Sequence, residues 1–168
     1  MRRAARIDAD RLREIFHYDP STGVFTNRIR RGSRAAAGAT AGCINNSTGY
    51  WRLRIDSVDV WAHRAAWCYV TGLWPTLHID HIDGDKLNNR FTNLRDVRGS
   101  VNSQNLRRPH SDNKAGFLGV SWEKRGRAYV ANIYVDGHNR TLGRFSEPEK
   151  AHAAYLSAKR RLHEGCVV

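Results

Sequence analysis

The alternation of hydrophobic and polar residues divides the first 50 residues into one helix, a strand and a loop. Apolar residues recur at helical spacing directly after Asp8, which predicts a short helix that Asp8 caps. "DPSTG" is typical of a turn, and the alternating run 24–31 predicts a strand after it. Residues 32–49 are rich in small side chains, and we expect a loop there.

In the middle of the chain the hydrophobic pattern changes twice, from a strand period to a helix period and back. Residues 50–55 alternate with Leu53 and Ile55 on one parity, which predicts a half-buried strand followed by a turn and a second strand. "AHRAAWCYVTG" has helical spacing and should end at Gly72. Beyond Gly72, the pattern of residues 78–105 predicts a short strand, an irregular loop, a second short strand and a helix that begins near Ser100.

The last third predicts a two-layer module. Residues 116–145 hold three predicted strands, and Asp136–Gly137 between the last two is a strong hairpin signal. Ser146 and Glu149 predict a capping box for a helix that ends at Gly165. The helix face that should pack on the sheet comprises Ala151, Ala154, Tyr155, Ala158 and Leu162. The fold class is therefore α+β, with a small three-stranded antiparallel sheet packed on one helix.

A polar segment separates this module from the rest. Residues 106–115 contain Pro109 and many polar side chains, which is a linker composition. We therefore predict an N-terminal domain over 1–105, a linker over 106–115 and a second domain over 116–168.

The charge favours a polyanionic partner. The chain has 28 Lys and Arg against 16 Asp and Glu, a formal net charge of +12, and 23 of the basic residues are arginine. Arginine pairs bidentately with phosphate and with the guanine edge, so we expect a nucleic acid as the partner. RNA binding is an alternative that the charge alone motivates.

The cysteines and the hydropathy indicate an intracellular protein. Cys43, Cys68 and Cys166 form no C-x-x-C pair, which argues against a zinc ribbon and a disulfide framework. No apolar run is long enough to span a membrane, and the N-terminus lacks the apolar core of a signal peptide. We expect a cytoplasmic protein without membrane association or a small-molecule cofactor.

One stretch, "HIDHIDGDKLNNRFTNLRDV" (78–97), concentrates the residues that carry chemistry. Asp80 can ligate a hard divalent cation, and His81 beside it can take a proton from water near neutral pH. The following helix offers Asn102 or Asn105 as a second oxygen ligand. Asn93 lies between, and its amide could bind backbone and hold the loop that presents His81. Together these groups favour metal-assisted phosphodiester hydrolysis.

The segment "HRAAWCYVTGLWPTLHIDHIDGDKLNNRFTNLRDVRGSVNSQN" resembles the HNH nucleases of phage and intron homing endonucleases. The resemblance implies a ββα-metal core, here with an N-terminal β-rich extension. It also implies that Asp80 and Asn102 bind the metal, with Asn102 favoured over Asn105 by its spacing, that His81 is the general base and that Asn93 orients it. The implied cofactor is Mg²⁺, with Mn²⁺ as a substitute, and the implied substrate is double-stranded DNA. Because Arg90 and Arg95 lie beside this site, we expect them to contact phosphate, with plain surface charge as the alternative.

The segment from Gly119 to Lys159 resembles the APETALA-type (ethylene-response-factor) DNA-binding domain, through its G-V, Y-V-A-x-I, L-G-x-F and E-x-A-x-x-A-Y signs. The resemblance implies that the sheet lies in the major groove. The DNA-binding residues that we expect here are Trp122, Arg125, Arg127, Asn132, Tyr134 and Arg140.

These expectations combine into one function and one rival. The chain should be a magnesium-dependent endonuclease of the phage or mobile-element homing type, acting as a monomer in the host cell to nick or cut DNA. The rival is a non-catalytic DNA-binding regulator on an HNH scaffold.

Overall fold

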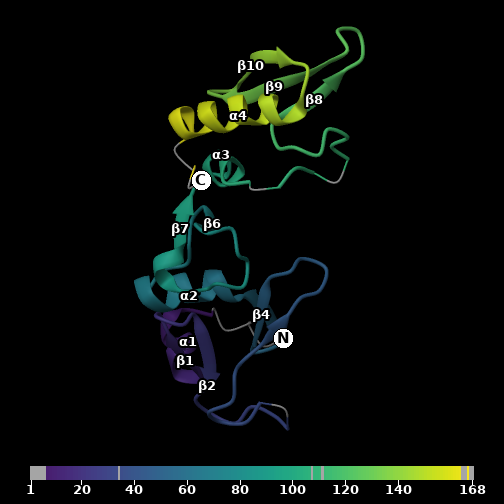
Figure 1. Cartoon of the computed structure of the whole chain (residues 1–168). Helices are drawn as coiled ribbons and strands as arrows, with labels where there is room; N and C mark the ends of the chain where they lie inside the picture. The colour runs from purple at the N-terminus through teal and green to yellow at the C-terminus, as the bar shows by residue number, and fades with distance from the viewer. Residues whose placement is uncertain (1–6, 34, 107, 111, 164–165, 167–168) are drawn as a thin grey trace, which may run out of the picture. The chain divides into compact units, whose positions relative to one another are not determined.

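The computed structural model describes residues 7–33, 35–106, 108–110, 112–163 and 166 (Figure 1). The chain divides into two compact units, Met1–Arg98 and Gly99–Val168. Within the described residues the fold is mixed α+β, with four α-helices and small antiparallel sheets. The domain boundaries expected at 105 and 115 stay a prediction.

The first unit begins with a helix and a hairpin and then builds a second small sheet. Its elements are α1 (Ala9–Ile15), β1 (Phe16–Asp19), β2 (Val24–Asn27), β3 (Cys43–Ile44), β4 (Trp51–Ile55), β5 (Val58–Trp61), α2 (Ala62–Thr71), β6 (His78–His81), a 3-10 turn (Phe91–Asn93) and β7 (Leu94–Val97). Strand β1 pairs with β2, β4 lies between β3 and β5, and β6 pairs with β7. The expected α1, "DPSTG" turn, β4–β5 pair, α2 and β6–β7 strands are confirmed.

The core of this unit lies between α1, α2 and the sheets. Asp8 caps α1 by accepting a hydrogen bond from the Arg11 backbone N–H at 2.8 Å. Leu12 of α1, Leu53 of β4 and Cys68 of α2 are fully buried together in one cluster. Because α2 supplies three buried alanines to that cluster, the helix packs closely on its neighbours.

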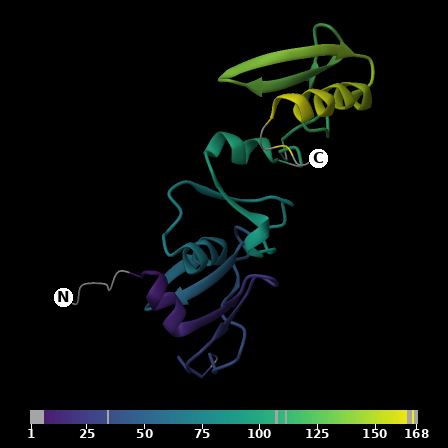
Figure 2. The ribbon, with the colours of Figure 1, turned by 90° about the vertical axis from the view of Figure 1, so that its left-hand side faces the viewer.

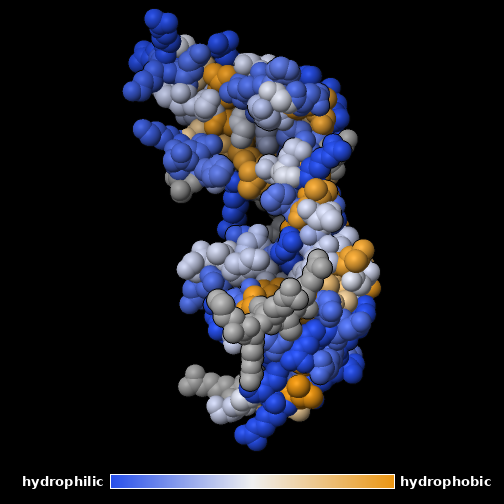
Figure 3. All heavy atoms as spheres, turned by 180° about the vertical axis from the view of Figure 1, so that it is seen from behind, coloured by the Kyte–Doolittle hydropathy of each residue, from blue (hydrophilic) through white to orange (hydrophobic). Residues whose placement is uncertain are grey.

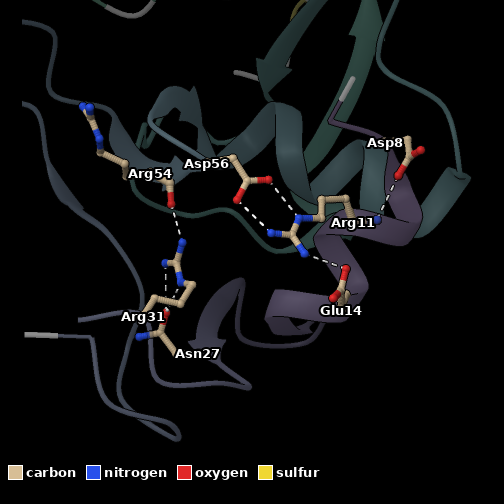
Figure 4. A network of polar contacts seen from close by, with 7 residues as sticks. All are labelled: Asp8, Arg11, Glu14, Asn27, Arg31, Arg54 and Asp56. Atoms are coloured by element: carbon tan, nitrogen blue, oxygen red, sulfur yellow. Dashed lines mark hydrogen bonds and ion pairs between the residues drawn. The ribbon is translucent and has the colours of Figure 1, made fainter. Parts of the chain in front are cut away.

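An arginine network joins α1 to the β4–β5 turn (Figure 4). Arg11 donates to both carboxylate oxygens of Asp56 at 2.8 Å and to Glu14 at 2.7 Å. Arg31 donates to the backbone carbonyl of Arg54 at 2.6 Å and to the side chain of Asn27. These contacts connect the N-terminal helix and the β2–β3 loop to the β4–β5 hairpin.

The second unit contains α3 (Gly99–Gln104), β8 (Val120–Glu123), β9 (Ala128–Val135), β10 (His138–Phe145) and α4 (Pro148–Leu162). The sheet order is β10–β9–β8, and α4 lies along one face of it (Figures 1 and 2). Asp136 and Gly137 both have positive φ, as a two-residue hairpin turn requires, so the expected hairpin is confirmed. Ala115 and Phe117 pack on the core of this unit.

Four local expectations are wrong. The run 24–31 is a strand only to Asn27, because the Asn27 backbone turns to bond Gly38 and Ala39 in the returning loop. Residues 16–19, expected in a helix and turn, form β1, and the expected loop contains β3. The predicted capping box is absent, because Pro148 takes the first helical position and leaves Glu147, whose side chain makes no cap bond, at the N-cap.

The end of α4 also differs from the expectation. The helix ends at Leu162, and Gly165 lies outside the described residues. Ala151, Tyr155 and Ala158 are buried as expected, whereas Leu162 is 39% exposed. Figure 3 shows the rear face of each unit as largely hydrophilic, with hydrophobic residues in small scattered groups. In the described part of the chain no helix is long and apolar enough to cross a membrane.

Candidate active site

Strand β6 carries the two central residues of the predicted site. In its register with β7, Asp80 lies opposite Arg95 and His81 lies opposite Leu94. Strand alternation would expose every second residue, yet Ile79, Asp80 and His81 are all buried. Both polar side chains are therefore removed from bulk water. Their electrostatic interactions are stronger in this buried position than they would be in solvent.

Asp80 is paired with an arginine across the ladder. Arg95 Nε donates to Asp80 Oδ2 at 2.8 Å, and Nη2 donates to the same oxygen at 2.6 Å. A buried carboxylate needs such compensation, because burial without a partner strongly disfavours its charge. Asp80 thus offers a hard oxygen ligand, which the guanidinium of Arg95 already contacts.

The His81 ring is held by an asparagine that sequence reasoning did not single out. His81 Nε2 lies 3.3 Å from Asn89 Oδ1, and Asn89 Nδ2 donates to the Leu87 carbonyl at 3.2 Å. Since an amide oxygen only accepts, this contact favours the tautomer with the proton on Nε2. That tautomer puts the basic lone pair of His81 on Nδ1.

Two more rings surround His81. His63, the second residue of α2, packs edge-on with a centroid separation of 5.2 Å, and Tyr50 lies 5.9 Å from His81 and 4.9 Å from His63. Burial lowers the pKa of His81 and lowers the pKa of His63 to about 3. The pKa of Tyr50 is raised, first by burial and then by the charge of Asp80. These rings form a neutral aromatic wall beside the carboxylate.

His63 has a further unusual feature. Its side chain is only 7% exposed, and Nδ1 is buried without a hydrogen-bond partner among the described residues.

Asn93 holds the loop that follows β6. Its side-chain oxygen accepts from the Asp83 N–H at 3.0 Å, and its amide donates to Asp83 Oδ1 at 2.9 Å and to the Asn88 carbonyl at 2.8 Å. Its backbone carbonyl also accepts from the Ile82 N–H. Asn93 thus makes the contacts with the loop backbone that were expected of it. Its role in orienting His81 stays a prediction, and it is the Asn89 side chain that contacts the ring.

The β1–β2 hairpin contacts the same loop. Tyr18 donates its hydroxyl to the Asn89 carbonyl at 2.7 Å, and Arg90 Nε donates to the Ser21 carbonyl at 2.7 Å. Gly23 has φ +77°, and a Cβ there would lie 2.5 Å from the Asn89 and Arg90 backbone. Only glycine allows this approach, so the "DPSTG" turn helps to set the position of Asn89.

The expected second metal ligand lies on α3, in the other unit. Asn102 is partly buried there, and Asn105 directly after α3 is 6% exposed and donates its N–H to the Asn102 carbonyl at 3.1 Å. The preference for Asn102 over Asn105 stays a prediction. Among the described residues no group of three or more His, Cys, Asp or Glu side chains could hold a metal.

The expected DNA-binding residues of the second unit fall on different surfaces. Trp122 lies opposite Tyr129, in the same parity as the core pair Val120 and Ala131, so it is on the α4 side of the sheet. Its ring is 45% exposed and lies 4.8 Å from Tyr129. An open pocket of about 490 Å³ beside it is lined by Asp112, Asn113, Lys114, Ala115, Val120, Ser121, Trp122 and Lys124.

The opposite, helix-free face carries Asn132 and Tyr134. Asn132 Oδ1 accepts from the Thr141 hydroxyl at 2.9 Å, and Tyr134 is 65% exposed. Arg140 lies opposite Ile133, hence on the α4 side, and its guanidinium is 3.5 Å from Asp136. Arg125 and Arg127 are exposed in the β8–β9 turn. The structure thus brings Asn132 and Tyr134 together and separates them from Trp122 and Arg140.

In the comparison with known families, one family matches a segment that includes the candidate site. Residues 60–104 match the HNH endonuclease family. This HNH segment spans the end of β5, α2, β6, the loop with Asn89 and Asn93, β7 and α3. The expected site residues Asp80, His81, Asn93 and Asn102 lie inside it, and the alternative ligand Asn105 lies one residue beyond it.

A phage protein and the solved structures complete the comparison. The chain is 36% identical over 80 residues to "Protein 3.8" of Escherichia phage T7, which covers 46% of this chain and 65% of the phage protein. No solved structure matches the chain. The chain thus spans about 65% of the length of this phage relative, and the HNH match covers the segment that contains the candidate site.

Sequence reasoning missed the roles of Asn89 and Tyr50. Asn89 belongs to an amide-rich loop where asparagine usually bonds local backbone, so its contact with His81 had no distinct signal. Tyr50 has the parity of Arg52 and Arg54, which suggested an outward position.

Proposed function

We propose that this chain is a metal-dependent endonuclease that hydrolyses phosphodiester bonds of double-stranded DNA, of the phage or mobile-element homing type. The observation that carries the proposal is the location of the HNH segment. Its match covers β6 and β7, where Asp80 and His81 are buried side by side and Asn89 and Asn93 fix the histidine and its loop. The net charge of +12 supports a polyanionic substrate.

The chemistry of the expected ligands fits a hard divalent cation. Asp80 supplies a carboxylate oxygen, and Asn102 would supply an amide oxygen from α3. We propose Mg²⁺ as the ion, which Mn²⁺ can replace. When bound, it would supply positive charge for the phosphate and for the oxygen that leaves.

The protein's own residues would perform the proton transfer. His81, with its proton on Nε2 held toward Asn89, would take the proton of the attacking water on Nδ1. Burial lowers the pKa of His81, so the ring is neutral and able to accept a proton at neutral pH. Asn93 would keep the loop closed around that geometry.

We propose that the DNA is held by positive and aromatic side chains in both units. Arg90 and Arg95 would contact phosphate close to the site. In the second unit, the β8–β9 turn with Arg125 and Arg127 would contact the backbone. Asn132 and Tyr134 would face bases in an APETALA-type arrangement, and Trp122 and Arg140 would contact DNA from the other side of the sheet.

A non-catalytic DNA-binding regulator is the second candidate. The observation that favours it is the contact between Asp80 and Arg95, which already neutralises the expected metal ligand. A regulator would bind DNA tightly and leave the phosphodiester bonds intact.

A supercoiled-plasmid assay separates the two candidates. We expect the wild type to convert supercoiled plasmid to nicked circles with Mg²⁺ and to stop on addition of EDTA. D80A and H81A should lose at least about 100-fold in nicking rate and still shift DNA on a gel. If all three proteins bind DNA and the wild type cuts with neither Mg²⁺ nor Mn²⁺, the regulator is the correct function.

A further inference from the structure

Among the described residues of the first unit, the ion pair between Asp80 and Arg95 is more shielded than the pairs that Arg11, Arg13, Arg52 and Arg54 make. The side chains are 6% and 24% exposed, and both nitrogen donors converge on Asp80 Oδ2. The two residues are direct partners in the β6–β7 register, so the backbone itself brings them together. This geometry places a fixed positive charge on the carboxylate.

A second cross-strand pair of the same residue types shows the contrast. Arg54 lies opposite Asp59 in the β4–β5 register, and its Nη1 is 3.1 Å from Asp59 Oδ1. These side chains are 65% and 38% exposed, so water screens the pair. Of these two pairs, the Asp80 pair is the one in which the arginine replaces solvent as the partner of the carboxylate.

We propose that Arg95 is the resident counter-cation of Asp80, which a divalent metal must displace or outcompete when it binds. This inference rests on the proposed function, in which Asp80 is a metal ligand. Arg95 keeps the buried carboxylate compensated in the metal-free protein and so makes folding independent of the metal. The same contact weakens metal binding, because the guanidinium repels the incoming cation and occupies one of its ligand oxygens.

The test measures Mn²⁺ affinity in the absence of DNA. Free Mn²⁺ is followed by its EPR signal as the full-length chain is titrated at pH 8. We expect R95M to bind Mn²⁺ about tenfold or more tightly than the wild type, a factor that corresponds to ~1.4 kcal/mol. R95K, which keeps the charge without the planar fork, should lie between them.

The controls separate local competition from net charge. R54M removes one arginine from the exposed cross-strand pair and should leave the Mn²⁺ affinity at the wild-type value. D80N should abolish the binding that R95M strengthens. Thermal unfolding provides a second measurement: Mn²⁺ should raise the melting temperature of R95M more than that of the wild type, because metal then replaces the missing cation.

The outcomes distinguish this inference from the function on which it rests. If D80N abolishes Mn²⁺ binding but R95M binds no more tightly than the wild type, Arg95 does not compete with the metal, and the proposed metal site stands. If neither the wild type nor R95M binds Mn²⁺ in a way that D80N changes, the metal site itself is wrong, and the inference is wrong with it.

Discussion

Asn89 is the residue through which the loop after β6 reaches the His81 ring. Its side-chain oxygen contacts Nε2, and its own amide is fixed on the Leu87 carbonyl. An imidazole that carries its proton on Nε2 has its basic lone pair on Nδ1, so loss of the Asn89 contact would allow the other tautomer and a different ring angle. Asn89 is therefore a positioning residue for the proposed base.

We expect N89A to lower kcat for plasmid nicking by about 10- to 100-fold with little change in KM, because DNA binding does not depend on the ring angle. N89D keeps an acceptor oxygen and should recover part of the rate. N46A, which changes an exposed asparagine in the turn before β4, is the matched control. Equal rates for N89A and N46A would show that Asn89 has no positioning role.

His63 should make the stability of the first unit depend on pH. Burial holds its pKa at about 3 in the folded chain, against about 6.5 when unfolded. The unfolded state therefore binds more protons between these values, so stability is fully present above pH 6.5 and is lost as pH falls. From pH 8 to pH 5 the loss from His63 should reach ~2 kcal/mol.

Urea unfolding at several pH values measures this dependence. H63F keeps a ring between Tyr50 and His81 but cannot titrate. Between pH 8 and pH 5 its free energy of unfolding should therefore fall by ~2 kcal/mol less than that of the wild type. H78F removes an exposed histidine and should retain the wild-type dependence. If the free energy of unfolding of H63F depends on pH as strongly as that of the wild type, the fold does not hold His63 neutral.

At the scale of elements, the β1–β2 hairpin matters because its turn touches the active-site loop. G23A would add a Cβ at a positive φ and 2.5 Å from the backbone of Asn89 and Arg90. G72A is the matched control, since Gly72 also has positive φ but a Cβ there meets nothing within 4 Å. Left-handed strain alone should cost G72A about 1 kcal/mol.

We expect G23A to cost a further ~1–3 kcal/mol in urea unfolding, because the turn or the loop must move. Its nicking rate should fall as well, since the loop carries the partner of His81, whereas G72A should keep the wild-type rate. If G23A and G72A are equally stable and active, the turn does not position the loop.

The elements that the sequence predicted correctly are those with local signals. Asp8, Gly72 and Asp136–Gly137 each act on backbone within a few residues, so the α1 start, the α2 end and the β9–β10 turn follow from the sequence. The capping box failed on an equally local conflict, because Pro148 set the helix start one residue later than Ser146 would.

Two kinds of feature lack a local signal in the sequence. Strands β1 and β3 each pair with the next strand along the chain, but they have only four and two residues and so show no clear alternation. In the site, the HNH-like spacing singled out Asp80, His81 and Asn93, and the structure confirms the loop contacts of Asn93. The contacts of Asn89 with His81 and of Arg95 with Asp80 depend on the folded register and the loop path, which no periodicity encodes.

At the scale of the whole molecule, the excess of positive charge predicts how DNA affinity responds to salt. Each phosphate contact releases condensed counterions, so log K falls linearly with log salt and the slope counts the contacts. Arg125 and Arg127 are exposed in the β8–β9 turn and make no ion pair or side-chain hydrogen bond within the described residues. They are therefore available for phosphate in a way that paired arginines are not.

We expect the double variant R125Q/R127Q to weaken duplex binding about uniformly across sequences and to reduce the salt slope by about two. Fluorescence anisotropy at a series of salt concentrations measures both effects. R52Q/R54Q removes the same charge from two arginines that Asp59 already pairs, and it should leave the slope almost unchanged. If both double variants lower the slope equally, the turn makes no specific phosphate contact, and DNA affinity follows the net charge of the chain.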